Sequence, residues 1–249
     1  MSIPNDVEHL KVIFAETAAR EQKRIALMED PANRGAHVLS FFGINTVFFL
    51  HKAFVEGDFQ ASKNYLYRAA MAQAYFHEIL NGEIFNVLKT FSYAVLADSP
   101  EVINRYLTYT RTQYHDSFNT YVNKAIQCVL RNDNKSLRVC IDGLKQQSET
   151  GWAKTYRPLV TIFEAIAVAN KTTLEQGLTD LLALRDQQEG DALLKSFIHL
   201  EATALAKLAL QKGIPVTLTS KYIPQQLLFN NELTNPRGYN FFDDLPELP

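Results

Sequence analysis

The chain has 249 residues, of which 47% are hydrophobic, and a formal net charge of −2 at pH 7. This length and composition suit a globular domain with a substantial core. Because acidic and basic residues nearly balance, there is no basic surplus to release counterions from phosphates, which argues against DNA or RNA as a direct partner. Ten glycines and nine prolines are few for this length and favour helices over strands and turns.

The N-terminal part predicts three helices in succession. The first is expected from about Asn5, a good N-cap residue, to about Met28, ahead of the stop signal Glu29-Asp30-Pro31. A second covers about 35–56 and holds the most apolar run, VLSFFGINTVFFL, which at roughly 13 residues is too short to span a bilayer. Gly57 ends this helix and Asp58 caps the next. We therefore expect a buried helix and no membrane contact.

Polar breaks recur along the rest of the chain. They fall at roughly 35- to 41-residue intervals, about one pair of antiparallel helices per unit, at Asp58, Asp98, Asp133, Lys171 and Lys212. The pattern predicts an all-α fold, an irregular stack of antiparallel helical hairpins. The units share no residue signature, and ordinary helix lengths produce the same spacing, so the stack is either solenoid-like or a compact helical bundle.

The C-terminal part breaks the helical pattern. A long apolar helix is expected to end at Gly213, in the position that needs a positive φ, and Pro215 forbids further helix. A short extended segment, 216–219, precedes a short helix over 225–229. We predict one helical domain over 1–229 and an irregular tail over 230–249. The tail is expected to pack back on the domain, and the alternative is a free recognition motif.

Motifs for catalysis, metals or cofactors are not found in the sequence. It lacks a phosphate-binding glycine loop, a Gly-x-Ser-x-Gly elbow and paired Glu-x-x-His ligands. Both cysteines, Cys128 and Cys140, sit beside apolar residues and are expected to be buried. Hydrogen-bonded structural roles are expected for four histidines in apolar stretches, His37, His51, His77 and His199. We expect no enzyme, no metal and no cofactor.

One aromatic series stands out, RYLTYTRTQYHDSFNTYVNK over 105–124, and the segment GWAKTYRPLV over 151–160 adds the one tryptophan. Tyrosine, tryptophan and arginine most often anchor protein interfaces. The alternative is a pair of amphipathic helices with tyrosines at the core margin. The candidate partner-binding residues are Tyr106, Tyr109, Arg111, Tyr114, His115, Asp116, Trp152, Tyr156 and Arg157.

Acidic groups form a second candidate surface. They lie in one loop and in the tail, at Asp186, Glu189, Asp191, Asp243, Asp244 and Glu247. Complementary charge would steer a basic partner. The alternative is that these polar loops are simply solvated.

The stretch LAKLALQKGIPVTLTSKYIPQQLL, over 205–228, resembles the C-terminal part of the immunity protein 49 family. RAAMAQAYFHEI, over 68–79, resembles the family's early Ala-rich helix, and 114–133 with 156–185 resemble its middle. The resemblance covers roughly two thirds of the chain, and the regions up to about 55 and after 229 match no family we can name. It carries over no catalytic motif and no binding residue.

This resemblance implies an all-α bacterial antidote that binds and neutralises a cognate toxin effector, encoded beside it, by stoichiometric occlusion. One alternative is a helical-repeat adaptor for a peptide or helix of a cellular protein. Another is a helical enzyme that acts on the toxin's product or modification. The start, MSIPNDVEHLKVIF, lacks the pattern of a secretory signal, and two cysteines make no disulfide framework, so a cytoplasmic location is expected. The sequence sets no oligomeric state.

Overall fold

The computed structural model describes residues 3–83, 87–110, 116–188 and 190–248. Within these ranges the chain forms eleven α-helices and no strand, with one isolated bridge between Ser220 and Ile223. The predicted all-α class is confirmed. The helices are α1 (Ile3–Met28), α2 (Pro31–Leu50), α3 (Phe59–Glu78), α4 (Val87–Leu96), α5 (Pro100–Thr108), α6 (Phe118–Arg131), α7 (Asn134–Gln147), α8 (Pro158–Ala167), α9 (Lys171–Ala183), α10 (Ala192–Phe197) and α11 (Leu200–Gln211).

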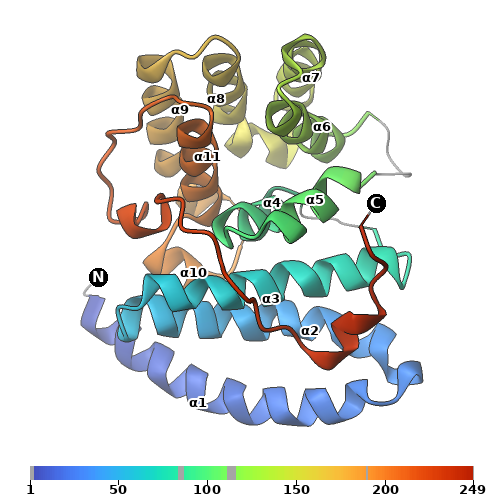
Figure 1. The fold of residues 1–249 in the computed structure, drawn as a ribbon. Helices are drawn as coiled ribbons and strands as arrows, with labels where there is room; N and C mark the ends of the chain where they lie inside the picture. Colours follow the sequence, from blue (N-terminus) through green and yellow to red (C-terminus); the bar gives the residue numbers. More distant parts are fainter. Residues whose placement is uncertain (1–2, 84–86, 111–115, 189, 249) are drawn as a thin grey trace.

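Helices α1, α2 and α3 run antiparallel, side by side, and form the lower layer of the molecule in Figure 1. Helix α1 begins at Ile3, not at about Asn5 as predicted. Pro4 is tolerated in the first turn because the backbone N–H that proline lacks has no helical partner at that position. Helix α2 begins at Pro31 instead of about Gly35. The Asp30 carboxylate caps it by accepting from the Ala32 N–H at 3.0 Å, so the stop signal is also a start signal.

The predicted break at 57–58 is confirmed. Gly57 has a φ of +74°, and Asp58 caps α3 by accepting from the Ala61 N–H at 2.9 Å. Just before this break, helix α2 continues without interruption into a π-helical turn, His51–Val55. This continuous helix, Pro31–Val55, has 25 residues, and an 18-residue window within it has a mean hydropathy of 1.6, so by length and composition it could cross a membrane. Much of it is buried between α1 and α3, as the core helix of a globular protein is.

Helices α6 to α9 form two consecutive antiparallel pairs in the upper part of Figure 1. Helix α11 lies beside them but packs against α4, and α10 contacts α1 and α2. In a solenoid each unit touches only its neighbours. These contacts between distant parts of the chain therefore make the stack closed and compact, as in the bundle alternative.

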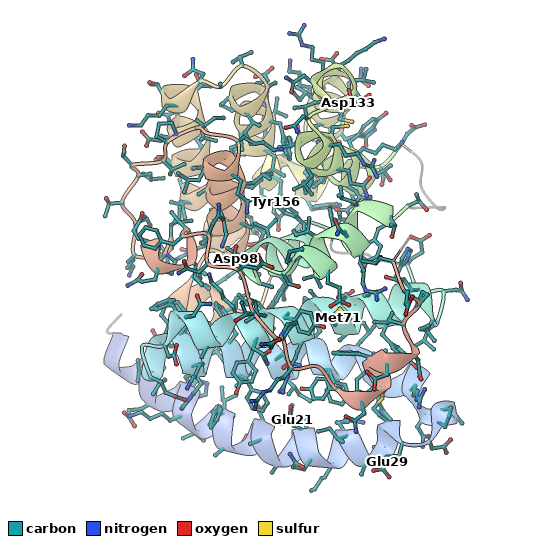
Figure 2. The ribbon with its side chains drawn as sticks, viewed as in Figure 1. Glu21, Glu29, Met71, Asp98, Asp133 and Tyr156 are labelled. Atoms are coloured by element: carbon teal, nitrogen blue, oxygen red, sulfur yellow. The ribbon has the colours of Figure 1, made fainter. Side chains whose placement is uncertain are left out.

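A buried ion cluster ties the two halves together. Asp98, at a φ of +53° just beyond α4, accepts from the Lys63 ammonium on α3 and, at 2.5 Å, from the Lys207 ammonium on α11. Both lysines are fully buried, with 1% and 0% exposure. They also donate to the backbone carbonyls of residues 227, 229 and 231. Figure 2 shows Asp98 where the lower end of α11 meets the chain that leads into the tail.

The described part of the tail, 230–248, crosses the faces of α3 and α2 as an irregular strap (Figure 1). Its apolar side chains are buried, at Tyr239, Phe241, Phe242 and Leu245. The Tyr239 hydroxyl donates to Glu21 of α1 at 2.5 Å and accepts from Asn45 of α2 at 3.0 Å. The tail thus completes the core above the lower layer.

Candidate functional site

Two of the predicted anchors lie in the core. Tyr106 and Tyr109, at the end of α5, have exposed fractions of 1% and 5%. Their rings pack against each other at 5.7 Å, and Tyr109 also packs against His77. Burial raises the pKa of both phenols well above the ordinary value. This placement is the core-margin alternative that the sequence left open, and neither ring is presented at the surface.

The backbone of the same stretch is held by α6. The Gln127 side chain donates to the Tyr106 carbonyl at 3.1 Å and to the Tyr109 carbonyl at 2.8 Å, and Asn123 donates to the Tyr109 carbonyl at 3.2 Å. The next three anchors, Arg111, Tyr114 and His115, lie outside the described residues. Asp116 is exposed and accepts from the Tyr121 hydroxyl at 3.3 Å.

The remaining anchors, Trp152, Tyr156 and Arg157, lie together over the buried ring of Phe118, and we call these four residues the aromatic patch. The Trp152 ring is 5.3 Å from the buried Phe118 ring and 5.9 Å from the Tyr156 ring. Trp152 keeps an exposed fraction of 53%, Tyr156 is half-buried and Arg157 is exposed. A large aromatic ring that is supported on one side and open on the other is the usual form of an interface anchor.

Local sequence explains this presentation. Gly151 turns the chain at a φ of +63°, and a 3₁₀ helix, Gly151–Tyr156, carries Trp152 and Tyr156 on neighbouring turns. Pro158 then starts α8, where the missing N–H costs no hydrogen bond. Figure 2 shows Tyr156 in the upper half of the molecule, between the α6–α9 helices and the lower layer.

The loop that follows α9 and carries Asp186, Glu189 and Asp191, which we call the acidic loop, is joined to the aromatic patch segment. The sequence did not indicate this proximity. The Gln188 side chain donates to the Thr155 carbonyl at 3.0 Å and ties the loop after α9 to the 3₁₀ helix, 33 residues away in the chain. Asp186 in this loop has a side chain that is 81% exposed. Asp191 is exposed and caps α10, and Glu189 lies outside the described residues. Aromatic and acidic groups are therefore presented on neighbouring loops.

The acidic residues of the tail are placed differently. Asp244 pairs with Arg34 and accepts from the Tyr75 hydroxyl at 3.0 Å, so it fastens the tail to α2 and α3. Asp243 is exposed beside it, and Glu247 is exposed near the end of the tail. The tail carboxylates thus do not extend the acidic loop.

All four histidines have hydrogen-bond partners of a structural kind. His37 pairs with Arg24 at 2.6 Å, His51 with Glu56 at 3.2 Å and His77 with the Gly82 carbonyl at 2.9 Å. His199 caps α11 through its Nδ1 atom. Among the described residues no group of three or more His, Cys, Asp or Glu side chains is arranged to hold a metal ion.

Both cysteines are free thiols. Cys140 is buried and Cys128 is half-buried, on the facing helices α7 and α6. Burial raises the pKa of the Cys140 thiol to about 12 and also raises that of Cys128. A thiol with a raised pKa holds little of the nucleophilic thiolate at neutral pH, which is typical of a structural cysteine.

These features define an all-α protein with a compact helical scaffold that presents aromatic and acidic groups on neighbouring exposed loops. The chain belongs to the immunity protein 49 family, whose model matches residues 57–227. That match spans α3 to the short 3₁₀ helix over 225–227 and includes the aromatic patch and the acidic loop. No curated protein and no solved structure gives a significant match to the chain. Immunity proteins of such families are generally non-catalytic.

Proposed function

We propose that this protein neutralises a cognate bacterial toxin effector by forming a stoichiometric complex that occludes a surface the toxin needs. The observation that carries this proposal is membership of the immunity protein 49 family over residues 57–227. Antidotes of this kind act by binding, and a preformed helical scaffold pays little ordering cost on association. The encounter is proposed to take place in the cytoplasm, where the free thiols Cys128 and Cys140 would stay reduced.

The proposed binding surface is the aromatic patch together with the exposed groups beside it. Trp152 and Tyr156 would supply large apolar area at little side-chain entropy cost, and Arg157 would supply a charged anchor. Asp186 would steer a basic partner from the rim, since rim charges act mainly on the rate of encounter. An interface of about 1,600 Å² is enough for a specific and stable complex, and a few anchors of this type carry most of its energy.

The deciding experiment is co-expression of the chain with the toxin domain encoded next to it. We expect the two to purify together, with a mass that corresponds to a fixed stoichiometry, and toxin activity to disappear at that same ratio in a titration. Activity lost at far lower ratios would indicate turnover and an enzymatic antidote. Absence of both complex and protection would overturn the proposal and favour the adaptor alternative.

A further inference from the structure

A cavity of about 260 Å³ lies beside the acidic loop, between α4, the loop after α9 and the start of α11. Its lining combines charged and apolar groups: Lys89, Arg185, Gln188, Asp191, Lys195 and Glu201 with Leu194, Ile198, His199 and Leu200. Gln188, which contributes to this wall, is the residue that bonds Thr155 of the aromatic patch segment. The cavity therefore adjoins the proposed binding surface.

His199, which lines this cavity, has an unused hydrogen-bond donor. Its side chain is 2% exposed, and its Nε2 atom is buried with no partner among the described residues. The buried backbone N–H of Ala202 donates to Nδ1 at 3.3 Å, so Nδ1 carries a lone pair and the proton of the neutral ring is on Nε2. If the ring is protonated, Nδ1–H faces Glu201 at 3.3 Å and Nε2 still carries a proton.

Arg185 contributes a second unused donor. Its guanidinium stacks over the Tyr222 ring at 3.7 Å and bonds Asp186 through Nη2 at 2.9 Å and through Nε at 3.0 Å. Its Nη1 atom is buried and has no partner among the described residues. Two buried donors without acceptors at one cavity are costly, because each loses its hydrogen bonds to water.

The lining specifies what would satisfy these donors. The ligand must accept hydrogen bonds. The lining itself holds three cationic side chains against two carboxylates, Asp191 and Glu201, and Asp186 pairs with Arg185 from outside the lining. The first turn of the twelve-residue α11 also faces the cavity through Leu200 and Glu201 and favours negative charge. Apolar walls from Leu194 and Ile198 suit a short aliphatic stem. We propose that this cavity binds a carboxylate group on a short aliphatic stem, held by His199 Nε2 and Arg185 Nη1.

Such a group has two sources. It is either the side chain of an acidic residue of the toxin, inserted beside the aromatic patch, or a free short-chain carboxylic acid. The recognition chemistry is the same for both. Only the first source rests on the proposed function, so binding of a small carboxylate to the protein alone tests the cavity independently.

The probe for this test is propionate, added to the purified full chain at about pH 7, with propionamide as its neutral isostere. We expect a saturable shift of the His199 side-chain ¹⁵N resonance with millimolar affinity, as befits so small a ligand. Propionamide is expected to bind at least about tenfold more weakly, because it lacks the charge. The His199 resonance is assigned by its loss in His199→Asn.

Two variants and a control locate the binding. Asparagine is a good N-cap residue, so His199→Asn keeps an acceptor for the Ala202 N–H while it removes the imidazole ring with its Nε2 donor. Because His199→Asn has no His199 resonance, propionate affinity is measured in every variant from the methyl shifts of the lining residues Leu194 and Ile198. It is expected to fall about tenfold or more in His199→Asn and in Arg185→Gln. His9→Asn, on the exposed face of α1, should leave it unchanged. If no saturable shift occurs, if propionamide binds equally well, or if both cavity variants bind propionate normally, the proposal is overturned.

The same variants identify the source once the toxin is in hand. Weaker toxin binding by His199→Asn, together with competition by propionate, would assign the carboxylate to the toxin. Unchanged toxin affinity with intact propionate binding would assign it to a free carboxylic acid. Failure to bind any toxin would sink the proposed function while leaving the propionate result standing.

Discussion

Lys207 on α11 and Asp98 just beyond α4 form a buried ion pair at 2.5 Å, although 109 residues separate them in the chain. Lys63 donates to the same Asp98 oxygen, so one carboxylate neutralises part of the charge of two ammonium groups. The surplus charge is met by backbone carbonyls of the segment that leads into the tail. Three distant parts of the chain therefore depend on a single side chain.

Replacing Asp98 with asparagine should be severely destabilising. Asparagine tolerates the positive φ of +53° and nearly keeps the shape, so the variant removes little except the charge. Two buried ammonium groups would be left without a counterion, at a cost of about 3–5 kcal/mol in the free energy of unfolding. Urea denaturation measures this. Asp186→Asn, at an exposed position, is the matched control and should stay within about 0.5 kcal/mol of the wild type.

The stability of the protein should rise with pH in the alkaline range because of Lys207. Burial lowers its pKa to about 8, helped by the nearby charge of Lys63 and opposed by Asp98. Between about pH 8 and pH 10.5 the folded state releases a proton that the unfolded state keeps, so the cost of burying the charge is relieved. Over this pH interval the free energy of unfolding of the wild type should rise by up to about 3 kcal/mol relative to that of Lys207→Met.

Urea denaturation of the wild type and of Lys207→Met at about pH 7.5, 9 and 10 measures the difference in their free energies of unfolding. The other titrating groups are common to the two proteins. A difference that stays flat or shrinks as the pH rises would show that Asp98 holds Lys207 fully charged.

Two glycines should respond to alanine with opposite signs. At Gly177 on α9 an added Cβ would lie 2.8 Å from Ile162 Cγ1 and 3.2 Å from the Ile162 backbone nitrogen of α8, so the two helices would have to separate. We expect Gly177→Ala to cost about 1–3 kcal/mol. At the exposed Gly43 on α2 nothing lies within 4 Å, and alanine should stabilise by about 0.5–1 kcal/mol. Thermal unfolding distinguishes the two, and a stabilised Gly177→Ala would contradict the close α8–α9 contact.

Docking of the tail should depend on Tyr239. Tyr239→Phe removes the hydroxyl that joins Glu21 and Asn45 but keeps the ring that stacks on Phe241 at 5.4 Å. We expect it to cost about 1–3 kcal/mol, and Tyr239→Ala to cost about 3–5 kcal/mol because the ring is lost as well. Limited proteolysis near residue 235 should accelerate in the same order. Equal proteolysis of all three chains would mean that the tail is not held by this residue.

Toxin binding should depend on the aromatic patch. Trp152→Ala removes a ring that is 53% exposed, so the fold should tolerate it, while affinity for the toxin should fall by about thirtyfold or more if Trp152 is an anchor. Val139→Ala on α7, exposed by 67%, is the control for loss of apolar surface outside the patch. Calorimetric titration with the toxin measures both. Equal affinities would remove the patch from the interface.

Local signals in the sequence predicted the helices well. The cap at Asp58, the turn at Gly57 and the end of the last long helix at Gly213, with a φ of +78°, depend on residues within a few positions of each other. The expected helix over 225–229 is a 3₁₀ turn, Gln225–Leu227, because one turn after Pro224 is too short to form an α-helix.

Contacts between distant segments were beyond reach of the same reasoning. The residues that flank Lys63 and Lys207 in the sequence do not indicate that both ammonium groups are buried against the Asp98 carboxylate. Lysines are almost always found at the surface, so a single sequence predicts exposure for both. The aromatic spacing likewise did not separate Tyr106, which is buried, from Trp152, which is exposed. The contact of Gln188 with Thr155 depends on how α9 folds back along α8, and a single sequence carries no record of it.

The buried cluster also bears on where a self-sufficient unit of this family ends. The family match stops at residue 227, whereas Lys63 and Lys207 donate to carbonyls at 229 and 231, and α3 packs on α2, which lies ahead of residue 57. A fragment limited to the matched range would expose the face of α3 that packs on α2. It would also remove backbone carbonyls that accept hydrogen bonds from the Lys63 and Lys207 ammonium groups. We therefore expect the folded unit of this protein to extend beyond the matched range at both ends.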